Sequence, residues 1–392
     1  MNNSVPTAPK VLLFGPPFGR TIARGNGGGT GGYTRNMQAY MSSLEVDGIV
    51  LEPLFHTVRG ERSGVLETFA ARMIADCWRI TKALIGRRPD AVHAVATYRA
   101  ALPREVFLAA LCRVLGVKLI YDIKAGEFVT RYEQGHAAYR AAVEYVLRSA
   151  GVVLVEGAAY QQFLGRRFGI NSEFFPNFVP LAEVPAAVPK RLAGDALRLL
   201  FVGYCYEGKG VKSLLEGCAL AAKSGLRCEL TLIGEQEPGF EAFADAFVTP
   251  ACMTLRRLGR QPHKEVLAAM TRNDIYCYPS AHRGEGHSNS INEAMMHGMV
   301  IVTTRHGFQS EVLGDDAAYF LERATGDEIA KMIVSIASDR HAARGKASRA
   351  RARLVAEFTS RQASERLRRA YARALATTPS PDAVPEISSV PQ

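Results

Sequence analysis

The sequence predicts an α/β protein built from two doubly wound parallel sheets, and three observations lead to this prediction. The chain has 392 residues, which at about 150 residues per domain indicates two domains. In both halves, short apolar runs bounded by Gly, Pro or Asp alternate with longer helical stretches, a pattern typical of parallel sheets with crossover helices. A Pro- and Ala-rich segment, residues 178–194, interrupts this pattern and predicts a domain boundary.

The first half contains five apolar segments that we expect to form strands. They are residues 10–15, 48–54, 91–96, 117–123 and 152–156. The first run ends at Pro16 and Pro17, which cannot continue a hydrogen-bonded ladder. We therefore expect a first Rossmann-like domain over residues 1–180.

The same pattern restarts after the boundary and predicts a second Rossmann-like domain over residues 195–356. The predicted strands are 197–203, 228–234, 274–279 and 300–304, and the predicted helices include 211–224 and 291–298. An Arg-rich segment, 343–375, is a long stretch of helical character. Its last part, 357–375, is expected to cross back to the first domain. Residues 376–392 contain four prolines and are expected to be a disordered tail.

Composition limits the functional classes. Apolar residues make up 47% of the chain and charged residues 22%, as in ordinary globular proteins. The net charge of +10 favours anionic partners such as nucleotide phosphates or an anionic membrane surface, although it could also be surplus surface charge. The Arg-rich stretch has few aromatic residues and no recognition motif, so nucleic acid is not expected.

Cysteine usage and the N-terminus bear on the compartment. The seven cysteines form no CxxC pair and no metal-like spacing with histidines, so we expect reduced core thiols. The first ten residues lack a basic region followed by an apolar stretch, and no apolar run reaches the length of a membrane span. These observations predict a cytoplasmic protein.

The most informative segment runs from Asp274 to Gly298. A strand leads into a short polar loop and then a helix, so Ser288, Asn289 and Ser290 are expected to present free N–H groups at a helix N-terminus, where phosphate binds. Glu285 and Glu293 flank that turn. Because carboxylates repel phosphate but accept hydrogen bonds from hydroxyl groups, we expect them to face sugar or ribose hydroxyls.

Structural interpretations exist for both acids. Ser290 and Glu293 match a capping box, in which Glu293 would only stabilise the start of the helix. Glu285 alone could be a solvated loop charge. The functional hypothesis therefore depends on the combination of residues.

That combination resembles the signature of the retaining glycosyltransferases of family 4, which have the two-domain GT-B fold with a central cleft. The shared features are Glu285, seven residues, Glu293, then Ala-Met-x-x-Gly and an apolar strand. The resemblance implies that Glu285 contacts the donor sugar and that Glu293 holds the ribose. It also implies that the turn of His287, Ser288, Asn289 and Ser290 binds the diphosphate.

Further positions agree with the resemblance in the expected order. Gly203 and Lys209 resemble the donor-phosphate segment, in which the lysine neutralises charge on the departing diphosphate. Arg260 and Gln261 correspond to a segment near the base. Two differences stand out: Tyr204 occupies a position where the family usually has Arg, and Asp122 stands near the end of a first-domain strand where the family often has a catalytic His.

The glycine-rich run 25–32 adds a first-domain element to the expected site. Glycines let backbone approach a ligand closely, and by resemblance Gly31 and Gly32 face the donor phosphates. A flexible surface loop is the alternative. No DxD sequence is present, and neither an essential metal nor a cofactor is expected.

The resemblance implies an enzyme that transfers a sugar from a nucleoside diphosphate sugar to a lipid-linked or cell-surface glycan acceptor. A nucleotide-sugar epimerase of similar fold is one alternative. A nicotinamide-dependent dehydrogenase is another, because Gly27, Gly29 and Gly32 satisfy GxGxxG and Glu52 lies twenty positions after Gly32. Residues 203–209 also mimic a phosphate-binding P-loop, but Gly210 replaces the hydroxyl residue that would bind magnesium.

One segment suggests where a membrane could be contacted. Residues 65–85 combine Leu66, Ile80 and Trp78 with Arg79 and Lys82, as in amphipathic helices that lie on lipid. A buried core helix is the commoner meaning of such a stripe.

Overall fold

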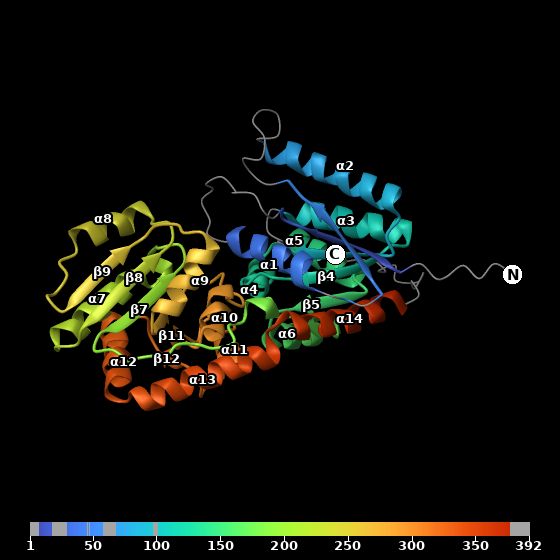
Figure 1. Ribbon diagram of the computed structural model, residues 1–392. Helices are drawn as coiled ribbons and strands as arrows, with labels where there is room; N and C mark the ends of the chain where they lie inside the picture. The colour runs from blue at the N-terminus through green and yellow to red at the C-terminus, as the bar shows by residue number, and fades with distance from the viewer. Residues whose placement is uncertain are drawn as a thin grey trace.

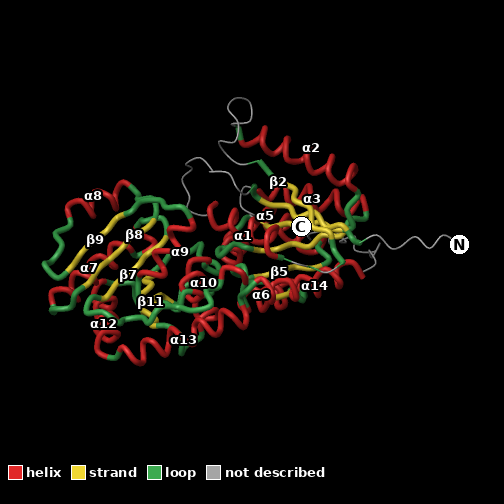
Figure 2. The backbone as a smooth tube through the Cα atoms, viewed as in Figure 1, coloured by secondary structure: helices red, strands yellow, loops and turns green. Residues whose placement is uncertain are grey.

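The computed structural model describes residues 8–17, 30–44, 46, 48–57, 68–96 and 101–376. Two six-stranded sheets, each with every described strand pairing parallel, form two α/β domains that lie side by side (Figures 1 and 2). This arrangement confirms the predicted fold class. Among the helices in these ranges, none is long and apolar enough to cross a membrane.

The first sheet has the order β2-β1-β3-β4-β5-β6. Its strands are β1 (Lys10–Gly15), β2 (Val50–Phe55), β3 (Ala91–Ala96), β4 (Lys118–Ile123), β5 (Val152–Val155) and β6 (Glu173–Phe174). Its helices are α1 (Thr30–Ser43), α2 (Phe69–Arg87), α3 (Leu102–Leu115), α4 (Phe128–Gln134), α5 (Ala137–Ser149) and α6 (Ala158–Phe168). Side chains of α2, α3 and α5 pack on one face of the sheet, and α1 packs on the other.

The second sheet has the order β12-β11-β10-β7-β8-β9. Its strands are β7 (Leu197–Val202), β8 (Cys228–Ile233), β9 (Met253–Arg257), β10 (Ile275–Tyr278), β11 (Val300–Thr304) and β12 (Tyr319–Leu321). Its helices are α7 (Val211–Lys223), α8 (Pro238–Ala246), α9 (His263–Arg272), α10 (Asn289–Met296), α11 (Gln309–Leu313), α12 (Gly326–Ser338) and α13 (Arg340–Glu357). The direction of winding reverses between β7 and β10, which is where ligands bind in sheets of this kind.

The chain crosses between the domains twice, and the two crossings are paired. The Val179 N–H donates to the Phe358 carbonyl at 3.0 Å, and the Ser360 N–H donates to the Val179 carbonyl at 2.9 Å. After this point α14 (Ser360–Ala376) packs against β4, β5 and β6 of the first sheet, whereas α13 packs in the second domain. The Arg-rich helical stretch predicted over 343–375 thus consists of two helices, α13 and α14, which the crossing at Phe358 and Thr359 separates.

Other departures from the predicted elements are small. Strands β6, β9 and β12 were not predicted; they have only two, five and three residues, which is too short for a clear strand pattern. Residues 377–392, predicted as a tail, lie outside the described residues.

Candidate active site

Lys209 and Glu285 lie together at the carboxyl ends of the two strands where the winding reverses. Lys209 ends a short 3-10 turn, Glu207–Lys209, after β7, and Glu285 belongs to the loop between β10 and α10. The Lys209 ammonium pairs with the Glu285 carboxylate and donates to the Tyr278 hydroxyl at 2.8 Å. The tertiary structure thus joins two residues that are 76 positions apart in the chain.

Glu285 is surrounded by donors. Besides Lys209, the Tyr278 hydroxyl donates to it at 3.1 Å and the Ser280 hydroxyl at 2.7 Å. Burial, followed by the negative charge of Glu285, raises the pKa of Tyr278 well above its usual value. The phenol therefore keeps its proton and can donate it. These donors hold the carboxylate in one orientation, and Glu285 is only 6% exposed.

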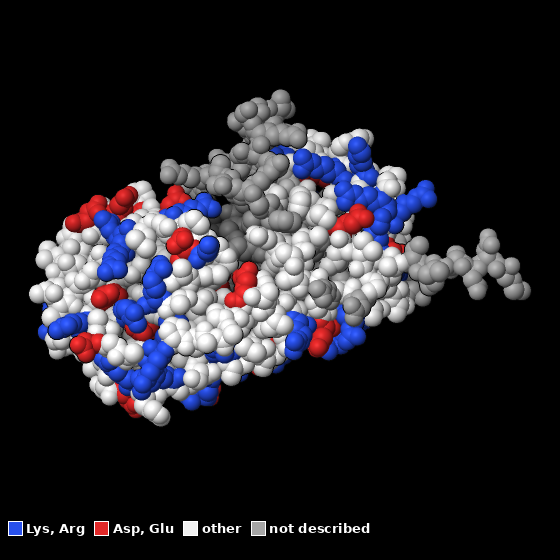
Figure 3. Space-filling model, viewed as in Figure 1, with Lys and Arg blue, Asp and Glu red and all other residues white. Residues whose placement is uncertain are grey.

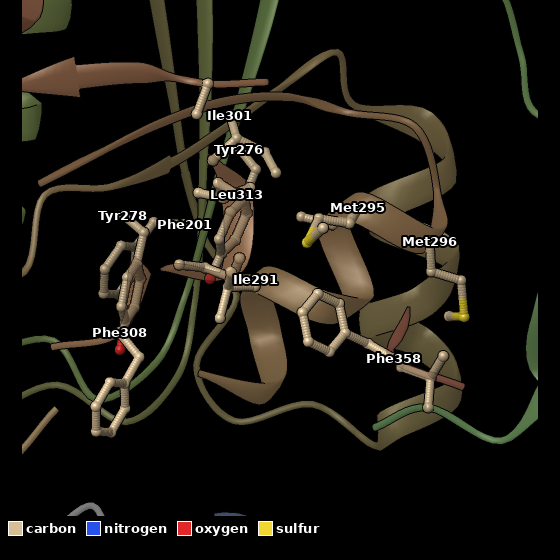
Figure 4. Close-up of a cluster of buried hydrophobic side chains, with 14 of the residues drawn as sticks. Phe201, Tyr276, Tyr278, Ile291, Met295, Met296, Ile301, Phe308, Leu313 and Phe358 are labelled. Atoms are coloured by element: carbon tan, nitrogen blue, oxygen red, sulfur yellow. The ribbon is translucent and has the colours of Figure 1, made fainter. Parts of the chain in front are cut away.

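The backbone under this cluster requires glycine at one position. Gly210 is the N-cap of α7 and has a φ of 68°, and a Cβ there would lie 2.2 Å from the Pro279 carbonyl oxygen. Any other residue would separate the β7–α7 turn from the end of β10. The Tyr278 ring stacks with Phe201 and with Tyr276, and the ring centroids are 6.0 Å apart in each pair (Figure 4).

Helix α10 points its N-terminus at the same region. Ser288 occupies the N-cap position and Asn289 is the first helical residue, so the first turn presents N–H groups that no residue within the helix can accept. The Tyr276 hydroxyl donates to the Ser290 Oγ at 2.7 Å, which ties the first turn to the sheet. The structure thus places Ser288, Asn289 and Ser290 at a helix start, the geometry that suits an anion.

Glu293 has a different role from a cap. It is the fifth residue of α10, and its Oε1 lies 3.1 Å from His263 Nε2 at the start of α9. Ser290 lies inside the helix, since Ser288 is the N-cap. The capping-box interpretation is therefore wrong. Glu293 is positioned by helix α10 against α9, beside the segment that carries Arg260 and Gln261.

Those two residues lie in different environments. Arg260 lines an open pocket of about 430 Å³ together with Glu235, Gln236, Glu241 and Gly259. Gln261 instead donates its side-chain amide to the Leu258 carbonyl at 2.6 Å.

Gly203 follows the end of β7 and lies against the end of β8. A Cβ at Gly234 would be 1.8 Å from the Gly203 carbonyl oxygen, so the two strand ends are in close contact.

His287 lies where the two domains meet. Its backbone N–H donates to Glu156 of the first domain at 3.3 Å, and its carbonyl accepts from the Asn177 amide at 2.6 Å. Its Nε2 lies 2.8 Å from Asn292 Oδ1. Burial lowers the pKa of His287 to about 3, so the ring is neutral. Its side chain faces the protein interior.

Asp122 is placed away from the Lys209 cluster. It has no exposed surface, and its carboxylate accepts from the Tyr40 hydroxyl at 2.9 Å and pairs with Lys124 at 3.4 Å. His93 Nε2 is also 3.4 Å away. These partners belong to the first domain, so the structure does not bring Asp122 to the other predicted catalytic residues.

The glycine-rich run is described only at its end. Gly31 and Gly32 lie in the first turn of α1. Residues 25–29, which include Gly27 and Gly29 of the GxGxxG match, lie outside the described residues.

Sequence reasoning missed several residues that support the site. Tyr278 and His263 hold the two glutamates, and Glu156 contacts the loop of His287 from the first domain. Tyr278 could have been found as a polar group at the end of a buried strand that precedes the loop. His263 and Glu156 carry no such signal, because their partners are distant in the chain.

The described residues contain no group of three or more His, Cys, Asp or Glu side chains that could hold a metal ion.

Comparisons with known proteins agree with this geometry. Residues 196–339 match the family model described as "Glycosyl transferases group 1". No curated protein matches the chain in sequence. The group 1 match favours a transferase over the epimerase alternative.

Solved structures resemble nearly the whole chain. HepE of Anabaena in complex with UDP-glucose has a TM-score of 0.65 and 15% identity, covering 93% of this chain and 99% of HepE. Sucrose-phosphate synthase from Thermosynechococcus elongatus has a TM-score of 0.68 and 14% identity, covering 93% and 98%. A glycosyltransferase from Rickettsia africae has a TM-score of 0.65 and 12% identity, covering 94% and 99%. The chain is thus a glycosyltransferase of GT-B fold, and its residues 196–339 match the group 1 glycosyl transferases.

Proposed function

We propose that the chain is a retaining glycosyltransferase with the family 4 signature Glu285-x7-Glu293, and that it takes its sugar from a nucleoside diphosphate donor. The observation that carries this proposal is the cluster of Lys209, Glu285, Tyr278 and Ser280 beside the N-terminus of α10. It combines a cation and helix N–H groups, which suit a diphosphate, with a carboxylate, which suits sugar hydroxyls.

In the proposed reaction the bond between the anomeric carbon and the diphosphate oxygen breaks, and a bond to the acceptor oxygen forms on the same face. Lys209 and the first turn of α10 stabilise the negative charge on the leaving diphosphate. The acceptor hydroxyl passes its proton to that diphosphate, so no protein nucleophile is required.

The acceptor is proposed to be a lipid-linked or cell-surface glycan, reached at an anionic membrane surface. Helix α2 supports this part of the proposal. It exposes Ile74, Trp78 and Ile85, which are 71%, 69% and 58% exposed and fall on one face at helical spacing. Its only acid, Asp76, is buried and paired with Arg104.

The first test is a screen of the purified protein against UDP-, GDP- and ADP-sugars, with NAD and NADP included. Because HepE was solved with UDP-glucose, UDP-sugars are the first donors to try. We expect thermal stabilisation by one nucleoside diphosphate, and transfer to a model acceptor with the donor's anomeric configuration retained, read by NMR. Inversion would refute the retaining mechanism, and stabilisation by NAD or NADP alone would refute the donor class.

A further inference from the structure

A chain of side-chain amides crosses from the first domain to helix α10. Asn36 of α1 donates its amide to Asn177 Oδ1 at 2.9 Å and accepts from the Asn289 amide at 3.0 Å. The Asn177 side-chain amide donates to the His287 backbone carbonyl at 2.6 Å. The Asn177 backbone carbonyl accepts from the Asn292 side-chain amide at 3.0 Å. The Asn292 Oδ1 faces His287 Nε2 at 2.8 Å.

The direction of every bond in this chain follows from its neighbours. The Asn292 amide nitrogen is used on Asn177, so its oxygen faces the histidine and His287 Nε2 carries the hydrogen. Both polar ends of Asn36 are likewise engaged, one with each domain. Asn36, Asn177 and Asn292 are all buried. A buried asparagine whose side-chain nitrogen and oxygen are both hydrogen-bonded keeps one orientation, because turning the side chain over would leave both groups unpaired.

The two ends of the network lie on elements of the proposed reaction. Asn36 follows the glycine run at the start of α1, and Asn289 is the first residue of α10. Close contacts beside the network show how tightly the loop before α10 lies on the first domain. A Cβ at Gly126 would be 2.1 Å from the Glu285 carbonyl oxygen, and one at Gly286 would be 2.4 Å from Glu156 Oε2.

We infer that Asn36 is a positioning residue for sugar transfer: through Asn177 and Asn289 it holds the N-terminus of α10 and the adjoining Glu285 loop against the first domain. The inference rests on the proposed function for its catalytic consequence. Its structural content, that Asn36 keeps the two domains together, stands on the amide network alone.

The test uses Asn36→Ala, which removes both bonds, and Asn36→Asp, which replaces the donor toward Asn177 with an acceptor. We expect kcat for transfer to fall by between about 10- and 100-fold, because small misplacements of reacting groups have effects of this size. The Kd for the nucleoside diphosphate should stay within about twofold of wild type, since Asn36 lies outside the second domain. The share of donor lost to hydrolysis should rise as water enters a less closed cleft.

Asn273→Ala is the matched control, because Asn273 is a buried asparagine of the second domain whose amide bonds the Ala269 carbonyl at 2.8 Å. It should leave the ratio of hydrolysis to transfer unchanged. If Asn36→Ala keeps kcat within twofold of wild type, or alters the ratio no more than the control, the inference is overturned.

Small-angle X-ray scattering of wild type and Asn36→Ala separates this inference from the proposed function. We expect a larger radius of gyration for the variant, at unchanged secondary structure by circular dichroism. Equal radii would overturn the inference whatever the enzyme's activity. A wild-type protein that transfers no sugar from any donor would refute the proposed function, while the scattering comparison would still decide the role of Asn36.

Discussion

At the scale of single residues, the candidate active site depends on which group carries each proton. Burial and the charge of Glu285 keep the Tyr278 phenol protonated by raising its pKa, so it serves as a donor to the carboxylate. Burial lowers the pKa of His287 to about 3, so its one ring N–H is used on Asn292. Lys209 and Glu285 form the ion pair of the cluster.

Removing either charge should slow the reaction without unfolding the chain. We expect Lys209→Met and Glu285→Gln each to lower kcat by about 10²- to 10³-fold, the size of effect seen when one stabilising group is lost. Single-turnover kinetics with the donor found in the screen provides the measurement. Lys223→Met, at the other end of α7, is the control and should keep the wild-type rate. Wild-type rates in both site variants would contradict the assignment.

Glu156 should make stability fall as the pH rises. Burial raises its pKa from 4.5 to about 7; Lys124 and the His287 N–H oppose this shift, and the negative charge of Asp122 adds to it. Between about pH 4.5 and pH 7 the folded state keeps a proton on Glu156 that the unfolded state has lost. The free energy of unfolding therefore falls as the pH rises through this range. The whole effect is at most about 3 kcal/mol.

Glu156→Gln removes this titration. We therefore expect the variant to be more stable than wild type at pH 8, with the difference shrinking toward pH 4.5. Urea unfolding of both proteins across this range gives the comparison. A stability difference that does not change with pH would show that Glu156 does not titrate as described.

At the scale of elements, helix α2 has two apolar faces. One face, which includes Ile80 and Leu84, is buried against the first domain. The other, with Ile74, Trp78 and Ile85, is exposed. Figure 3 shows Lys and Arg side chains over the part of the surface where Figure 1 places this helix. Both earlier interpretations of the segment, core helix and surface helix, therefore apply to opposite faces of the same element.

The exposed face should bind anionic lipid. We expect the double variant Ile74→Ser/Trp78→Ser to bind vesicles of phosphatidylglycerol and phosphatidylcholine at least about 10-fold more weakly than wild type, because two large apolar side chains are lost. Co-sedimentation measures the bound fraction, and added salt should weaken the remaining charge-dependent part. Val334→Ser, on the exposed side of α12, is the control. Equal binding by all three proteins would exclude α2 as the lipid contact.

At the scale of the whole molecule, the C-terminal helices join the two domains. Helix α13 belongs to the second domain and α14 covers the first sheet on the face opposite α2, α3 and α5. The paired crossings at Val179 and Thr359 lie between them. This arrangement predicts that α14 contributes to the stability of the first domain while donor binding in the second domain is independent of it.

Leu367→Ala tests that independence. Leu367 is fully buried in the cluster that α14 forms with the first sheet, so its truncation should cost about 2–5 kcal/mol of unfolding free energy. The Kd for the nucleoside diphosphate should not change under conditions where the variant is folded. Arg369→Ala, exposed on the same helix, should leave both quantities unchanged. A weakened nucleotide affinity in Leu367→Ala alone would show that the domains are coupled through α14.

The sequence by itself determined the two sheets, most strand positions and a helix start within the turn of Ser288, Asn289 and Ser290. These features depend on local chemistry: apolar runs of strand length, proline and glycine at their ends, and a polar residue before a helix. Lys209 and Glu285 were identified through the resemblance to the family 4 motifs, and both lie in loops that follow strands, where ligands bind in parallel sheets.

Only the tertiary structure decided how those residues are paired. The bond between Tyr278 and Glu285, the contact of His263 with Glu293, the burial of Asp122 and the amide network from Asn36 to α10 are all set by packing. No local pattern predicts them, because a hydrogen bond between residues as far apart as Asn36 and Asn289 depends on how two whole domains meet, and that contact is decided by the combined burial of many side chains.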